Sequence, residues 1–216
     1  QSTVSAAPTS IVAGGAASTI TVTARDQHGN AVSGASVTLA ATGTNTITQP
    51  SGTTDASGVI IGTLASTQAG DKVVTATIGA VTVTQTATVT VTAAAVDAAQ
   101  STVAVSDATI AAGTGTSTVT VTARDQYGNA VPGATVLIAA TGRNNTITQP
   151  SGVTDASGVA TGGFASTTSE AKTISATAAG VAITQTQVVT VVPDVASGPQ
   201  SSVAVSAASF VAGDAG

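Results

Sequence analysis

Four aspartates that each open a short turn-like segment are the first residues of this chain to suggest chemistry: Asp26, Asp55, Asp125 and Asp155. Carboxylates suit Ca²⁺, yet this ion takes about six to eight oxygen ligands, usually from several acidic side chains in one loop. Each segment here offers a single Asp, followed three residues later by Gly. That spacing is typical of a type I turn, in which the carboxylate accepts backbone N–H groups and Gly adopts a positive φ. We therefore expect these residues to stabilise turns rather than to bind a metal ion.

The only candidate for a catalytic base is His28, the one histidine of the chain. No acid or nucleophile motif lies near it, and the equivalent residue of a second, similar segment is Tyr127. We expect both side chains to be exposed at turn tips. The chain has no Cys, hence no disulfide, thiolate metal ligand or Cys nucleophile, and Ser or Thr is a poor nucleophile without a base. The sequence predicts that the protein is not an enzyme, has no catalytic, metal-binding or cofactor-binding residues, and uses no cofactor.

Charged side chains are few and scattered. They make up 7% of the 216 residues, the net charge is −5, and the isoelectric point is about 4.3. Nucleic-acid-binding proteins present clustered Lys and Arg, so we expect no nucleic-acid partner. No apolar run approaches the roughly 20 residues of a membrane span, so we expect no membrane insertion by this segment. Asp71 and Lys72 are predicted to form a surface pair. Arg25 and its equivalent Arg124 are predicted either to reach a carbonyl or carboxylate between domains or to be solvated.

These residues recur because the chain repeats itself. Gln1-Ser2-Thr3-Val4 returns at residues 100–103 and, with one substitution, at residues 200–203. The offset between the first two copies is 99 residues before a one-residue insertion near Arg143 and 100 residues after it. Such a period is too long for solenoid repeats of about 20 to 50 residues and is the size of a small independent domain. We predict two domains, at residues 1–95 and 100–193, and the first strand of an incomplete third repeat at residues 200–216.

Within each copy the pattern has a period of two residues. Ile20, Val22 and Ala24 alternate with threonines, which is typical of a half-buried strand with a Thr-covered solvent face. The strands predicted in the first copy are 3–6, 10–12, 18–24, 35–41, 46–49, 59–65, 72–78 and 81–91. Short strands separated by regular turns predict an all-β fold, namely tandem immunoglobulin-like β-sandwiches arranged end to end. With only 1% aromatic residues, each core should be thin and aliphatic, with Phe164 and Phe210 among the core residues.

The joints between copies are short. Residues 93–99 are rich in Ala, and residues 192–199 contain Pro193 and Pro199. Proline cannot donate to a strand ladder and favours extended backbone, so the second joint is predicted to be a semi-rigid spacer. The strand predicted at 81–91 runs almost directly into the next copy. We therefore expect consecutive domains to form a rod with limited bending.

Several sequence elements recur in the same order in both copies. Each copy carries Asp-x-x-Gly-Asn-x-Val-x-Gly-x-x-Val from Asp26 or Asp125, then Thr-Asp-x-x-Gly from Thr54 or Thr154, then Ala-Ser-Thr followed by Val/Ile-x-Ala-Thr. This series resembles the bacterial Ig-like domains of the invasin and intimin type (group 1). The resemblance implies an Ig-like fold and extracellular tandem arrays that act as stalks in bacterial adhesins and other surface proteins. In that type, receptor binding lies largely in terminal domains, including a Cys-containing lectin-like one, which nothing in this chain matches.

We interpret repetition without a site as structural. The favoured hypothesis is a non-catalytic spacer of a bacterial surface or secreted adhesin-like protein, which holds a terminal binding module away from the cell. Its partners are then neighbouring Ig-like repeats, while domains outside this segment bind a host or cell-surface protein or glycan. Two alternatives stay open: an adhesion module that itself binds protein or glycan, and a subunit of an extracellular fibre. In the fibre, the strand predicted at 202–206 pairs with another copy of the chain by strand addition.

Overall fold

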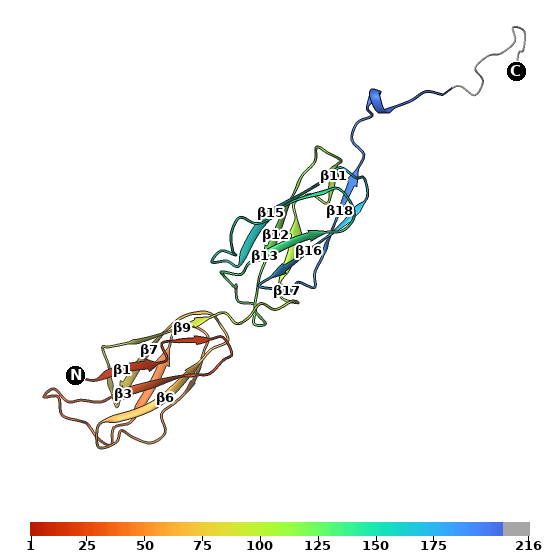
Figure 1. Ribbon diagram of the computed structural model, residues 1–216. Helices are drawn as coiled ribbons and strands as arrows, with labels where there is room; N and C mark the ends of the chain where they lie inside the picture. Colours follow the sequence, from red (N-terminus) through yellow and green to blue (C-terminus); the bar gives the residue numbers. More distant parts are fainter. Residues whose placement is uncertain (205–216) are drawn as a thin grey trace, which may run out of the picture.

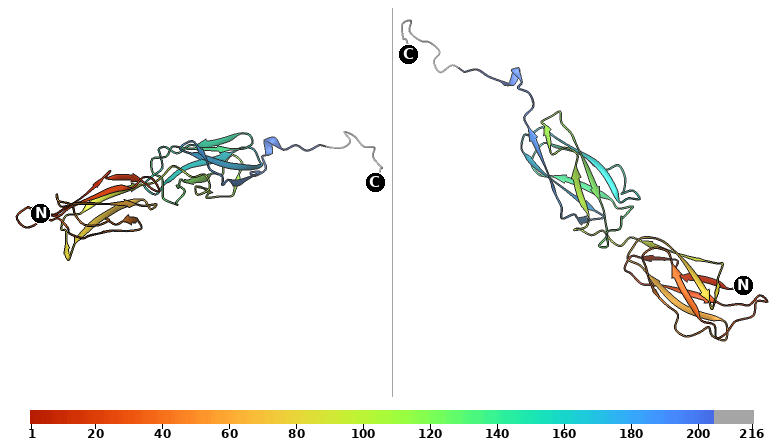
Figure 2. Two further views of the ribbon diagram at one scale, coloured as in Figure 1. Left: turned by 90° about the horizontal axis from the view of Figure 1, so that it is seen from below. Right: turned by 180° about the vertical axis from the view of Figure 1, so that it is seen from behind.

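The chain forms two β-sandwiches that follow each other along one axis (Figure 1, Figure 2). The computed structural model describes residues 1–204. The strands of the first domain are β1 (Thr3–Ala7), β2 (Ser10–Val12), β3 (Ser18–Thr23), β4 (Val37–Ala41), β5 (Thr46–Thr48), β6 (Val59–Ala65), β7 (Gly70–Ile78), β8 (Val81–Thr82) and β9 (Ala87–Thr92). Those of the second domain are β10 (Thr102–Val105), β11 (Thr109–Ala111), β12 (Ser117–Thr122), β13 (Val136–Ala140), β14 (Asn145–Thr148), β15 (Val159–Ser166), β16 (Ala171–Ala178), β17 (Val181–Ala182) and β18 (Gln187–Val192). A 3₁₀ turn, η1 (Gly198–Gln200), follows.

Each domain consists of two sheets packed face to face, with the same strand order in both domains. In the first domain the sheets are β1-β3-β6-β5 and β2-β9-β7-β4, with β8 beside β7. In the second they are β10-β12-β15-β14 and β11-β18-β16-β13, with β17 beside β16. The chain changes sheets between β1 and β2, and β2 runs parallel to β9. This architecture confirms the predicted all-β fold of tandem Ig-like sandwiches.

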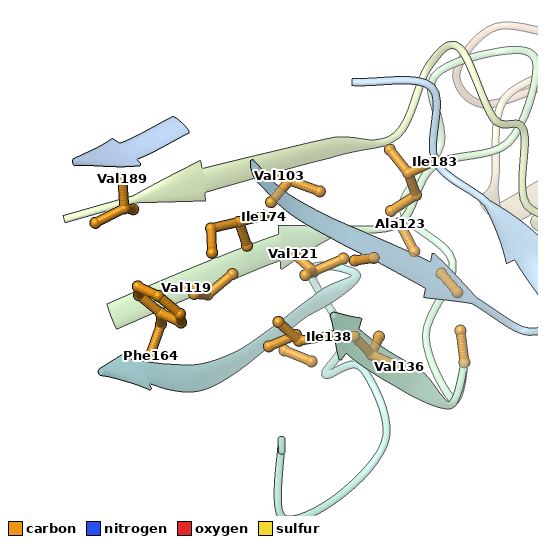
Figure 3. Packing of buried hydrophobic residues seen from close by; sticks show 14 of the residues in the cluster. Val103, Val119, Val121, Ala123, Val136, Ile138, Phe164, Ile174, Ile183 and Val189 are labelled. Atoms are coloured by element: carbon orange, nitrogen blue, oxygen red, sulfur yellow. The ribbon is translucent and has the colours of Figure 1, made fainter. Parts of the chain in front are cut away.

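The core of each domain is the thin aliphatic layer that the alternating pattern predicts. In β3, Ile20 and Val22 are buried, and the threonines that alternate with them are exposed or half-buried. Phe164 is the largest fully buried side chain and takes the place that Leu64 has in the first domain. It packs among Val, Ile and Ala side chains from both sheets (Figure 3). Its assignment to the core is confirmed, while Phe210 lies outside the described residues.

The predicted aspartate turns are present in both domains. One Asp55 carboxylate oxygen accepts the N–H groups of Ser57 and Val59, both at 2.8 Å. Gly58 has φ of +77°. A Cβ at Gly58 would also lie 2.5 Å from the carbonyl oxygen of Ala24, so this position needs glycine for two reasons.

The prediction of one continuous strand at residues 81–91 is wrong. Pairing with β7 runs from Ile78 opposite Val81 to Val74 opposite Ala87, so six steps along this segment match four along β7. The two extra residues interrupt the ladder as a bulge and divide the segment into β8 and β9. Val83 lies just before the bulge, where its N–H donates to the Ala76 carbonyl at 2.9 Å, and it is buried. The period-two pattern largely hides the bulge, because two extra residues keep the phase of the alternation and only Gln85 interrupts it.

The prediction that Asp71 and Lys72 form a surface pair is also wrong. Successive strand residues point to opposite faces, so Asp71 accepts the Thr90 hydroxyl at 2.7 Å while Lys72 is buried. The Lys72 ammonium donates to the side-chain oxygen of Gln68 at 3.3 Å. Its counterpart Lys172 is also buried and pairs with Glu170.

The strand predicted at the start of a third repeat is described only in part. Residues 201–204 do not lie in a strand. The rest of the predicted segment, 205–216, lies outside the described residues.

Candidate functional site

The two domains meet at a junction of four segments: the connecting residues 93–99, the loop 125–129 of the second domain, and two loops of the first, 66–69 and 13–15. The connecting segment leaves β9 at one end of the first sandwich and enters β10 at the near end of the second (Figure 1). A junction of this kind is the part of a two-domain rod that decides whether the rod bends.

The connecting segment is packed into the second domain. Val96 is only 8% exposed and belongs to the same hydrophobic cluster as Ala123 and Ile183. Its backbone forms an antiparallel bridge with Asp125. The N–H of Asp97 donates to the Arg124 carbonyl at 2.8 Å. The segment that the sequence presents as an Ala-rich linker is therefore an additional part of the second sandwich.

Asp125 joins its own turn to the connecting segment. Its side chain is fully buried; one carboxylate oxygen accepts the N–H groups of Tyr127 and Asn129, both at 2.9 Å. The other oxygen accepts the Asn129 side-chain amide at 2.8 Å and the N–H of Ala94 at 2.9 Å. Burial by itself would raise the pKa of Asp125, but these hydrogen bonds outweigh it and hold the pKa below its ordinary value.

Asn129 crosses from the second domain to the first. Its side-chain amide donates to the carbonyl of Thr67 at 2.8 Å, and its side-chain oxygen accepts the N–H of Ala69 at 3.0 Å. Both donor and acceptor of one amide are thus used on the backbone of the loop 66–69. Because each bond has a directional optimum, the pair fixes the rotation of one domain against the other as well as their separation.

Tyr127 covers Gly14 at the same junction. Gly14 has φ of +69°, and a Cβ built on it would lie 2.7 Å from Cε2 of Tyr127 and collide with the hydroxyl. A glycine is therefore required both by the backbone and by the ring. Tyr127 remains 43% exposed, so its prediction as an exposed turn residue holds for only part of the side chain.

The same motif in the first domain makes only local contacts among the described residues. Asp26 accepts the N–H groups of His28 and Asn30 and the Asn30 side-chain amide, at 2.8 to 2.9 Å. The Asn30 side-chain bond is the main reason why the pKa of Asp26 lies below its ordinary value. His28 and Asn30 are exposed. The same pair of Asp and Asn side chains therefore stabilises a turn in the first copy and also joins the two domains in the second.

The remaining candidates stay within their own turns. Arg25 donates to the Gly29 carbonyl at 3.3 Å and Arg124 to the Gly128 carbonyl at 2.8 Å, so each reaches a carbonyl of its own domain. Across residues 1–204, no group of three or more His, Cys, Asp or Glu side chains gathers to hold a metal ion. Sequence reasoning identified Asp125, Tyr127 and Asn129 as turn residues but missed their role at the junction, and nothing in the pattern marked Val96.

No helix in the described part of the chain has the length and apolar character needed to cross a membrane.

The fold and the repeated motifs agree with a known family. The bacterial Ig-like domain family (group 1) matches residues 1–94 and again residues 99–192. The chain belongs to this family. The resemblance to Ig-like domains of the invasin and intimin type is thereby confirmed, and no curated protein sequence matches the chain.

Solved structures of invasin-type proteins are similar to these two Ig-like domains. InvD of Yersinia pseudotuberculosis has 29% identity and a TM-score of 0.71, covering 93% of this chain and 60% of that one. Invasin, described as a bacterial integrin-binding protein, has 27% identity and a TM-score of 0.69 over 89% of this chain and 40% of that one. FdeC, an Escherichia coli adhesin, has 26% identity and a TM-score of 0.57, over 88% and 63% respectively. The chain thus spans less than two thirds of each of these proteins.

Proposed function

We propose that these Ig-like domains form a non-catalytic spacer in a bacterial surface or secreted adhesin-related protein. The observation that carries this proposal is the junction, where a buried valine, a backbone bridge and the Asn129 amide hold two sandwiches end to end. A flexible linker of seven residues behaves as a random coil and does not fix the relative orientation of the two domains. The domains could then fold back on each other. A fixed joint keeps the two domains extended, so that their combined length separates a binding module from the cell surface.

The relatives support the location and the class of partner that we propose. Invasin carries the description integrin-binding and FdeC the description adhesin. By analogy, we place this chain outside the bacterial cell. We propose that the whole protein binds a protein or glycan on another cell through domains other than these two.

Small-angle X-ray scattering of the chain tests the spacer. Each domain of about 100 residues should have a radius of gyration near roughly 13 Å, and the pair should give an elongated distance distribution with a long tail. Inserting Gly-Ser-Gly-Ser between Thr92 and Ala93 should broaden that distribution, because it separates the domains while Val96 stays in its place. The same insertion after the exposed Gly52 is the matched control and should leave the distribution unchanged. A compact profile for the unmodified chain would overturn the proposal.

A further inference from the structure

The far end of the first domain carries a groove of about 700 Å³. Its apolar lining includes Ala24, Val32, Ile78 and Val81. Val81 is 69% exposed, whereas its equivalent in the second domain, Val181, is half-buried. Gln1 also lines the groove, and the N-terminus lies at the end of the first domain opposite to the junction (Figure 1).

The second domain shows how the same surface looks when it is covered. The equivalents of the groove residues are Ala123, Val131, Ala178 and Val181, and all of them pack with Val96 in one hydrophobic cluster. Val96 comes from the connecting segment, four residues before Gln100. Positions that are half-buried in the first domain, such as Ala35 and Ser2, have buried counterparts in Ala134 and Ser101.

The polar rim of the groove is also repeated. In the second domain, the N–H and hydroxyl of Thr184 both donate to the Ala98 carbonyl at 3.0 Å. The Arg124 carbonyl and the Asp125 carboxylate accept N–H groups of the connecting segment, from Asp97 and Ala94. The corresponding residues Thr84, Arg25 and Asp26 all line the groove of the first domain. The groove therefore offers one donor residue, Thr84, and two acceptor residues, Arg25 and Asp26, at the positions where the second domain binds an extended backbone.

We infer that this groove is the docking site for the connecting segment of a preceding Ig-like repeat. The occupant is an extended stretch of small residues with one branched aliphatic side chain four positions before Gln1, as Val96 stands before Gln100. The side chain fills the apolar floor, and the backbone pairs with Asp26 and Thr84. No aromatic ring lines the groove, so it lacks the flat stacking surface that sugar rings prefer. This inference is independent of the spacer proposal, because the groove can bind such a segment in an array of any shape.

The test extends the full chain at its N-terminus with a second copy of its own residues 93–99, Ala-Ala-Ala-Val-Asp-Ala-Ala. The matched control carries the same extension with Asp in place of its Val. Backbone amide resonances of Ala24, Val81 and Thr84 are compared by NMR in the unextended chain and in both extended chains. Exchange of the Thr84 amide with solvent is measured in the same samples.

With the valine extension, we expect shifts at all three amides and at least tenfold slower exchange of Thr84. The Asp control should resemble the unextended chain, and resonances of the second domain should not move in either sample. Identical spectra for the two extended chains would overturn the inference, since the groove would then not distinguish an aliphatic side chain from a carboxylate. A response that depends on protein concentration would overturn it as well, because the groove would then be filled by another copy of the chain.

Discussion

The two connecting segments of this chain are residues 93–99 and residues 193–199. Their composition predicts that the second is the more rigid, yet the first is the one that is packed in place. The second contains Pro193 and Pro199, which stiffen a backbone, and the first contains only Ala, Val and Asp. Yet Val96 in the first is 8% exposed, whereas Val195 in the second is 88% exposed. Among the described residues, only Val96 has the end of a following sandwich to pack against. The comparison teaches that the joint is fixed by the surface that receives the linker, not by the stiffness of the linker itself.

The sharpest test of this comparison is to place a charge at each valine. Val96→Asp should lower the free energy of unfolding of the second domain by about 2–4 kcal/mol, because an aliphatic group is lost from the core and a carboxylate must leave it. Val195→Asp should change it by less than about 0.5 kcal/mol. Denaturant unfolding is followed by Tyr127 fluorescence, since Tyr127 is the only Tyr and the chain has no Trp. Because Tyr127 also lies against Gly14, its emission reports the second domain together with the junction. Equal losses in the two variants would contradict our account.

A second test separates backbone strain from the junction contact. Gly14 and Gly113 are equivalent and both have positive φ, but only Gly14 has Tyr127 against it. Replacing either glycine by Ala should cost about 1–2 kcal/mol in its own domain through the left-handed backbone. Only Gly14→Ala should also change the native fluorescence of Tyr127, which lies in the other domain. If Gly113→Ala alters that emission to the same extent, the ring does not report the junction.

A third test replaces Asn129 or Asn30, and its expected effect on the junction is smaller because only one side-chain amide is removed. Each side chain binds the aspartate of its own turn, but only Asn129 also bonds to the first domain. Asn129→Ala should weaken the junction by about 1–2 kcal/mol, given about 0.5–1.5 kcal/mol for each hydrogen bond. Exchange of the Ala69 N–H with solvent should accelerate in this variant and stay unchanged in Asn30→Ala. Unaltered exchange in both would mean that Ala69 is protected by something other than Asn129.

The smallest effect on the junction is expected from lowering the pH. The pKa values of Asp26 and Asp125 are both lowered by hydrogen bonds in the folded protein. The stabilisation from the charged form is therefore present above the ordinary aspartate pKa of about 3.9 and is lost as pH falls through the lower folded value. Below about pH 4, protonation of Asp125 should shift the Ala94 amide resonance, while protonation of Asp26 should affect only its own turn. An Ala94 resonance that titrates near neutral pH would exclude Asp125 as the cause.

Much of each domain was predictable from sequence because its determinants are local. The alternation around Ile20 and Val22 and the Asp-x-x-Gly turn at Asp55 need only neighbouring residues to form. The bulge between β8 and β9 was missed because its two extra residues shift the register against β7 but keep the phase of the alternation, which only Gln85 interrupts. The junction was missed for a different reason. Asp26 and Asp125 have the same immediate neighbours in sequence. Only the turn of Asp125 lies against the connecting segment and the other domain, and this proximity gives it a role at the junction.

The parallel pairing of β2 with β9 has a mechanical consequence. The chain enters the first domain through β1 and β2 and leaves it through β9, which pairs with β2 at Ser10–Thr90, Ile11–Val91 and Val12–Thr92. A pull on the two ends of the domain slides these strands past each other, so the load falls on all their rungs together and not on one rung at a time. Shear of this kind resists tension through the height of the unfolding barrier, which governs forced unfolding, rather than through equilibrium stability. Stretching single molecules should therefore give one abrupt rupture for each domain, and removing the Ile11 side chain should lower the rupture force of the first domain alone.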